Sequence, residues 1–131
     1  MRRVVDASAL IDSLLPSDRQ DAALAAMSGR ELWAPAVIDM EVSSAIWRLE
    51  RTAQISSGEA ERAVAALWTV PLRRAQNGQI SRAAWRLRKS LRVSDAFYVA
   101  TAQLLHAELI TADARLSRAP SLVIPIVVLP H

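Results

Sequence analysis

The sequence predicts an α/β fold, a three-layer sandwich with a mostly parallel central sheet. Short apolar runs rich in β-branched residues alternate along the chain with longer segments of helical periodicity, and this alternation is typical of that fold class. The chain has 131 residues without a visible repeat or linker, so we expect a single domain over residues 1–131. A composition of 52% hydrophobic and 22% charged residues is that of a globular protein.

The first half of the chain predicts a strand, two helices, a second strand and a long helix. Pro16 ends the first helix, and Ser17 or Asp18 caps the second. Pro35 suits the first turn of the long helix, where its missing N–H is no loss. The expected strands are Arg2–Asp6 and Leu32–Ala34. The expected helices are Ala9–Leu15, a helix from the Ser17 or Asp18 cap to Met27, and Pro35–Thr52.

The second half predicts three helices and two strands. One helix follows Ser57–Glu59 and ends near Trp68, and Asn77-Gly78 separates it from the next. Ser94 caps a strongly apolar helix, and two β-branched runs then predict strands. The later ranges are Ile80–Leu91 and Ser94–His106 for the helices, and Glu108–Thr111 and Ile126–Leu129 for the strands.

The sequence also limits where in the cell the protein is expected and which kinds of reactive site it can form. The chain contains no cysteine, which excludes disulfides, thiolate metal sites and a cysteine nucleophile. The apolar run after Met1 is too short for a signal peptide, and no segment approaches the length of a membrane span. We therefore expect a cytoplasmic protein that does not associate with membranes.

Basic residues are concentrated in the middle of the chain. Residues 62–94 contain no acid and eight of the 16 basic residues, which favours a polyanionic partner. Within the predicted helix 80–91, Arg82, Arg86 and Lys89 share one face with Trp85 beside them. This face is either a solvated charged surface or an RNA-binding stripe whose aromatic ring stacks on a base.

Four carboxylates stand at the ends of predicted elements in apolar surroundings: Asp6, Glu41, Asp95 and Asp113. In a parallel sheet the carboxyl ends of the strands share one edge, where ligands bind, and Asp6 and Asp113 both follow strands. Four converging carboxylates would repel one another unless a cation lay among them. Mg²⁺ and Mn²⁺ prefer oxygen ligands, so these ions are the expected cofactors.

Each acid also has an ordinary structural explanation. Asp6, Asp95 and Asp113 can each cap a following helix or turn, and Glu41 can pair with Arg48 or Arg51. Asp39 and Glu41 flank the apolar stripe of their helix on opposite sides, so both cannot enter one pocket. Asp39 is explained by its place in the first helical turn, which favours Glu41 for the site.

A second apolar face lies on the same helix. Val37, Met40 and Trp47 lie roughly opposite the stripe that faces the core. A neighbouring helix covers this face, or the face is exposed and marks an interface.

Together these residues resemble the PIN-domain ribonucleases, and among them the VapC-type toxins of bacterial toxin–antitoxin pairs. The resemblance spans almost the whole chain in order and spacing. It is carried by Val4–Leu10, Ala34-Pro35, Met40–Val42, Ser94–Ala96, Tyr98–Ala100 and Leu109–Leu116. Arg115 departs from the pattern, because some relatives carry a further acid there.

The resemblance implies a metal-dependent endoribonuclease that uses metal-activated water, with the four acids as metal ligands and catalytic residues. It also implies that Ser8 and Thr111 support the carboxylates or a water, and that a VapB-type antitoxin and a second copy in a homodimer are partners. The histidines, His106 at a helix end and the terminal His131, are poorly placed for a general base. The alternative is a non-catalytic PIN-like module that binds RNA or protein.

Overall fold

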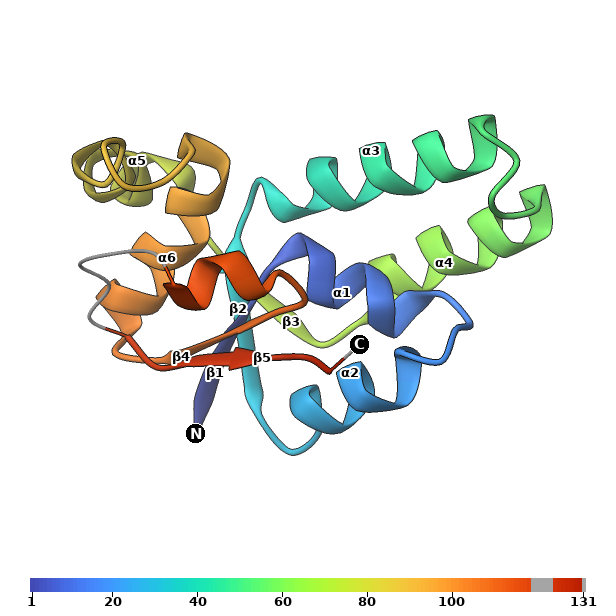
Figure 1. Ribbon diagram of the computed structural model, residues 1–131, viewed down its shortest axis with the longest axis horizontal. Coiled ribbons are helices and arrows are strands. Elements are labelled where there is room, and N and C mark those ends of the chain that lie inside the picture. The colour runs from blue at the N-terminus through green and yellow to red at the C-terminus, as the bar shows by residue number, and fades with distance from the viewer. Residues whose placement is uncertain (119–123, 131) are drawn as a thin grey trace.

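The computed structural model describes residues 1–118 and 124–130, and it confirms the predicted α/β sandwich (Figure 1). Five parallel strands form one sheet in the order β3-β2-β1-β4-β5. The terminal His131 lies outside the described residues. The strands are β1 (Arg2–Val5), β2 (Glu31–Pro35), β3 (Leu72–Ala75), β4 (Glu108–Thr111) and β5 (Ile126–Val128).

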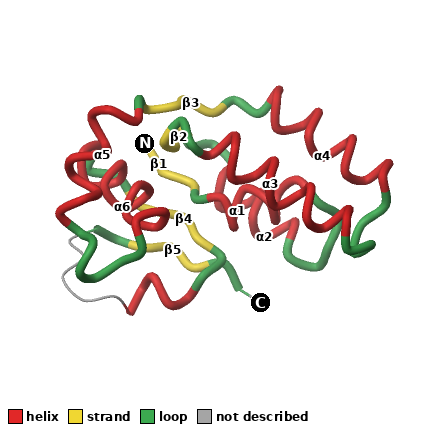
Figure 2. The backbone as a smooth tube through the Cα atoms, turned by 90° about the horizontal axis from the view of Figure 1, so that it is seen from above, coloured by secondary structure: helices red, strands yellow, loops and turns green. Residues whose placement is uncertain are grey.

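Helices cover both faces of the sheet (Figure 2). The first four helices lie on one side: α1 (Ala7–Leu14), α2 (Gln20–Met27), α3 (Ile38–Arg51) and α4 (Ser57–Thr69). Two helices lie on the other side, α5 (Asn77–Arg86) and α6 (Val93–Leu105), and a short 3₁₀ helix η1 (Ala114–Arg118) follows β4. Within the described ranges, every helix is too short or too polar to cross a membrane.

The core is built around the central strand β1 and its neighbour β4. Val4 and Val5 of β1 and Leu109 and Ile110 of β4 are fully buried. The predicted apolar stripe of α3 faces this core, since Ile38, Val42 and Ile46 are buried. Because apolar burial is the main favourable term in folding, these central strands provide a rigid base for the residues at their ends.

The largest departures from the predicted elements are one missed strand and two shifted boundaries. Strand β3 was not predicted, because Arg73 and Arg74 interrupt its apolar pattern. It is an edge strand, where charged side chains are common. Pro35 ends β2 instead of starting α3. Helix α5 spans Asn77–Arg86 instead of Ile80–Leu91, so Asn77-Gly78 begins the helix and Lys89 lies in the turn beyond it.

The strand order places a topological switch point between β1 and β4. From β1 the chain moves outward through β2 and β3, and then returns to the other side of β1 with β4 and β5. The backbone N–H of Asp6 extends the β1–β4 pairing by donating to the carbonyl of Ile110 over 3.0 Å. A crevice at the carboxyl ends of two such strands is the usual ligand site of parallel sheets.

Candidate active site

Asp6 is the buried centre of the crevice at the switch point. It is the N-cap of α1, and its Oδ1 accepts hydrogen bonds from the backbone N–H of Ala9 at 2.9 Å and the hydroxyl of Ser8 at 2.7 Å. Burial raises the pKa of Asp6 above its usual value, and the nearby charge of Asp95 contributes in the same direction. Asp6 therefore caps α1 and also lies in the crevice, so the two explanations offered for this residue both hold.

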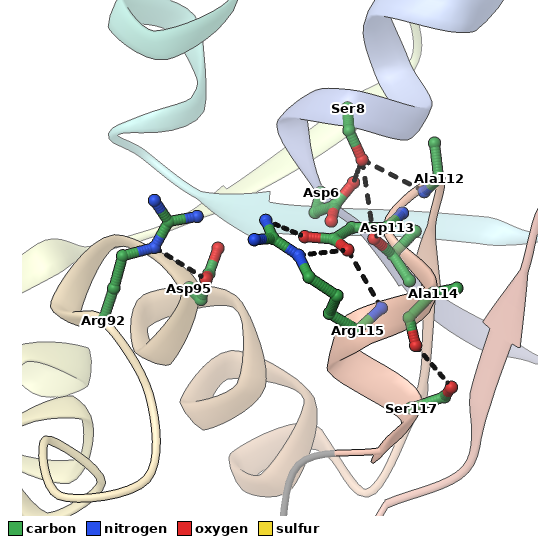
Figure 3. Close-up of polar contacts among 10 residues, drawn as sticks. Asp6, Ser8, Arg92, Asp95, Ala112, Asp113, Ala114, Arg115 and Ser117 are labelled. Carbon is green, nitrogen blue, oxygen red and sulfur yellow. Dashed lines mark hydrogen bonds and ion pairs between the residues drawn. The ribbon is translucent and has the colours of Figure 1, made fainter.

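Two hydroxyl groups join the segments that follow β1 and β4 (Figure 3). The Ser8 Oγ accepts a hydrogen bond from the N–H of Ala112 at 3.0 Å and lies 3.4 Å from the Thr111 Oγ1. The Thr111 hydroxyl in turn accepts from the N–H of Asp113 at 2.9 Å. Ser8 and Thr111 thus fix Asp6 and Asp113 relative to each other.

Glu41 reaches the crevice from the first turn of α3. The hydroxyl of Tyr98 on α6 donates a hydrogen bond to Glu41 Oε1, which holds this carboxylate in place. Burial raises the pKa of Tyr98 far above its usual value, and the hydrogen bond and charge of Glu41 add to the effect. The tyrosine is therefore a fixed donor at neutral pH.

Asp39 points away from this crevice, consistent with the helical wheel, which excludes Asp39 and Glu41 from sharing one pocket without choosing between them. Arg74 of β3 donates to both oxygens of Asp39, each at 2.8 Å, in a bidentate ion pair. This pair holds the N-terminal turn of α3 to the edge of the sheet. Of Asp39 and Glu41, only Glu41 lines the crevice.

The remaining two acids are each paired with a neighbouring arginine (Figure 3). Asp95, in the first turn of α6, lies 3.5 Å from the Nε of Arg92. Asp113 accepts from the Nε and Nη2 of Arg115 at 3.1 and 2.9 Å, and from the N–H of Arg115 at 2.9 Å. These contacts with Arg115 lower the pKa of Asp113 below its usual value, so this carboxylate stays ionised.

All four acids line one open cleft of about 280 Å³. The cleft is also lined by Ser8, Arg48, Arg92, Ser94 and Tyr98. Asp6, Glu41, Asp95 and Asp113 come from four segments far apart in the sequence, and four carboxylates around one cleft are a donor set suited to Mg²⁺ or Mn²⁺. Their role as metal ligands stays a prediction.

The carboxylates are not arranged around one point. Among residues 1–118 and 124–130, no three acidic or histidine side chains are placed so as to hold a metal ion. Glu41 is instead engaged by Tyr98, Asp95 by Arg92 and Asp113 by Arg115. Binding a cation would therefore require these side chains to rearrange.

Three charged or aromatic residues of this cleft were not predicted to belong to the site. Arg48 and Arg92 line it, and Tyr98 holds Glu41. A signal for Tyr98 is its position three residues after Asp95, because residues three apart share a helix face. No comparable signal identified Arg92, which precedes the helix in a stretch rich in arginine.

The predicted RNA-binding residues lie outside this cleft and are exposed. Arg82, Arg86 and Lys89 are all exposed, but only the first two belong to α5. Trp85 is 58% exposed, and the guanidinium of Arg88 lies 4.6 Å from the centre of its ring. One face of the ring is therefore already covered by a cation, while RNA binding by this surface stays a prediction.

Comparisons with known proteins agree on one family. The model of the PIN domain family matches residues 3–122. "Ribonuclease VapC3" of Mycobacterium tuberculosis strain H37Rv is 38% identical over 117 residues, which cover 88% of this chain and 85% of that protein.

Two solved structures share the fold. The Mycobacterium tuberculosis toxin VapC20, described as cleaving the sarcin–ricin loop, superposes with a TM-score of 0.69 at 17% identity, covering 98% of this chain and 99% of that one. A toxin–antitoxin complex from Klebsiella pneumoniae gives a TM-score of 0.69 at 23% identity, with 95% of each chain covered.

Replacing Asp6 with Asn should stabilise the fold at neutral pH. The asparagine keeps the capping oxygen but removes a buried charge. Because the pKa of Asp6 is raised in the folded state, the folded chain binds more protons than the unfolded chain, and stability falls as pH rises through that pKa. Thermal unfolding of Asp6→Asn should therefore occur above that of the wild type at pH 7.5, with the difference shrinking towards pH 4. Asp18→Asn, at an exposed position, is the matched control, and a neutral-pH loss of stability in Asp6→Asn would contradict the prediction.

Proposed function

Since the chain belongs to the PIN-domain family, we propose that it is an endoribonuclease acting as the toxin of a toxin–antitoxin pair. One observation carries this proposal: Asp6, Glu41, Asp95 and Asp113 line a single cleft at the switch point of the sheet. The similarity to proteins named as ribonucleases supports RNA as the substrate.

We propose that the four carboxylates hold Mg²⁺ or Mn²⁺. When bound, such an ion activates water and offsets negative charge on the phosphate. In this chain Tyr98 fixes Glu41, and the Ser8–Thr111 contact fixes the segments that carry Asp6 and Asp113. These contacts hold the segments that carry the acids on a rigid part of the fold, from which the carboxylate groups rearrange to bind a cation.

The exposed face of α3 supports a protein partner. Met40 is 59% exposed and Trp47 is 55% exposed, so no helix among the described residues covers them. Trp47 also lines a shallow cleft of about 200 Å³ with Ile46 of α3 and Ala60 and Val64 of α4. We propose that an apolar segment of a VapB-type antitoxin packs here. A homodimer and a cytoplasmic location stay predictions.

The function is tested by replacing Asp95 with Asn. This change keeps the shape of the side chain but removes its charge, so Mg²⁺-dependent cleavage of total RNA should fall by at least about 100-fold. Circular dichroism should show an unchanged fold, and Asp39→Asn should cleave normally. If the wild-type protein shows no metal-dependent cleavage, the chain is a non-catalytic binding module instead.

A second experiment tests the basic surface of α5. Replacing Arg82, Arg86 and Lys89 with Gln should weaken binding to single-stranded RNA because fewer counterions are released. The slope of log affinity against log salt should become shallower by about 2 if all three contact phosphates. Arg62→Gln with Arg51→Gln gives a control away from α5. An unchanged slope in the triple variant would show that the stripe is only a solvated surface.

The partner surface is tested with Trp47→Ala. Aromatic residues at the centre of an interface contribute strongly to affinity, so binding to the cognate antitoxin should weaken by at least about 10-fold. Ribonuclease activity of the isolated chain should be retained, since Trp47 does not line the acidic cleft. Leu24→Ala on α2, also exposed, is the control. Equal antitoxin affinity for Trp47→Ala and wild type would place the antitoxin on another surface.

A further inference from the structure

A second cleft adjoins the acidic cleft and carries an excess of positive charge. It has a volume of about 270 Å³ and is lined by Ser90, Leu91, Arg92, Asp95, Asp113, Arg115, Leu116 and Arg118. Three guanidinium groups thus meet two carboxylates. Arg92, Asp95 and Asp113 line both clefts, so the two cavities share a wall.

The arginines come from two separate segments of the fold. Arg92 precedes α6, whereas Arg115 and Arg118 lie on η1 after β4. Figure 3 shows the guanidinium of Arg115 on the side of Asp113 that faces Asp95, with Arg92 beyond it. Convergence of cations from different segments is an arrangement suited to an anion, because guanidinium groups bind phosphate with paired hydrogen bonds.

The two shared carboxylates are each engaged by an exposed arginine. The side chain of Arg115 is 72% exposed and that of Arg92 is 71% exposed, so neither is fixed by packing. Exposed ion pairs of this kind are weak and easily exchanged. Arg118, in contrast, forms no ion pair with a carboxylate of the described residues.

We propose that the second cleft binds the RNA phosphate next to the one that is cleaved, and that Arg92 and Arg115 change partners to do so. With a cation bound, Asp95 and Asp113 would turn from their arginines to the cation, and both guanidinium groups would be free to bind the phosphate. Arg118 is available to the phosphate throughout. Cation and RNA therefore strengthen each other's binding, as linkage requires. This inference rests on the proposed ribonuclease function.

The first test measures cation binding without RNA. Titration calorimetry with Mn²⁺ should show tighter binding to Arg115→Gln than to wild type, by about two- to fivefold, because the cation no longer displaces an exposed ion pair from Asp113. Arg118→Gln should bind Mn²⁺ as wild type does, and so should the distant control Arg62→Gln. Equal Mn²⁺ affinity for Arg115→Gln and wild type would overturn the exchange of partners.

The second test locates the phosphate. On a short RNA whose cut site has been mapped, kcat/KM should fall by about 10-fold in Arg115→Gln and in Arg118→Gln, the scale of one charge-assisted hydrogen bond. A second RNA carries one neutral methylphosphonate in place of the phosphate next to the cut. With this RNA, kcat/KM of the wild type should fall by a similar factor, whereas kcat/KM of the two variants should fall no further. If the effect of the arginine substitution and the effect of the methylphosphonate on kcat/KM multiply at every position tested, the proposed phosphate subsite is wrong. If the wild type cleaves no RNA, the ribonuclease function itself is refuted. The Mn²⁺ titration would still decide whether Arg115 gives up Asp113 when a cation binds.

Discussion

Asp6 is buried at the carboxyl end of the central strand, and the rest of the site is built around this one carboxylate. Its burial is unfavourable for the charged form, yet its oxygen caps α1 and accepts from Ser8. Ser8 in turn contacts Thr111 and the N–H of Ala112, which joins β1 to β4 at the switch point. A residue that disfavours stability but organises its neighbours is characteristic of functional sites.

The parallel topology explains how acids so distant in sequence meet. Helices that follow or precede parallel strands place their N-termini at the carboxyl edge of the sheet, and three such ends line the cleft. Asp6 caps α1, Glu41 lies in the first turn of α3, and Asp95 lies in the first turn of α6. The partial positive charge at each helix N-terminus favours a nearby carboxylate. The fold therefore offsets part of the repulsion among the acids before any cation binds.

The sequence predicted the architecture and the identity of the acids because both rest on local patterns. Apolar runs followed by a carboxylate identified Asp6 and Asp113, whereas the helical wheel showed only that Asp39 and Glu41 could not share one pocket. Strand β3 was missed because an edge strand with two adjacent arginines carries no alternating apolar pattern. The hydrogen bond from Tyr98 to Glu41 depends on tertiary packing, which local patterns do not determine. The position of Lys89 beyond α5 depends on the exact residue at which the helix ends, which local patterns do not determine either.

The partners of the four acids divide the cleft into two unlike halves. Asp6 and Glu41 are held by uncharged donors, the hydroxyls of Ser8 and Tyr98, and their surroundings are buried or half-buried. Asp95 and Asp113 are held by arginines whose side chains are largely exposed. Uncharged donors leave the negative charge of the first pair uncompensated, so this half attracts a cation. The exposed arginines compete for the second pair only weakly, because solvent screens such ion pairs. The rigid half therefore determines where a cation would lie, and the exchangeable half determines how readily it enters.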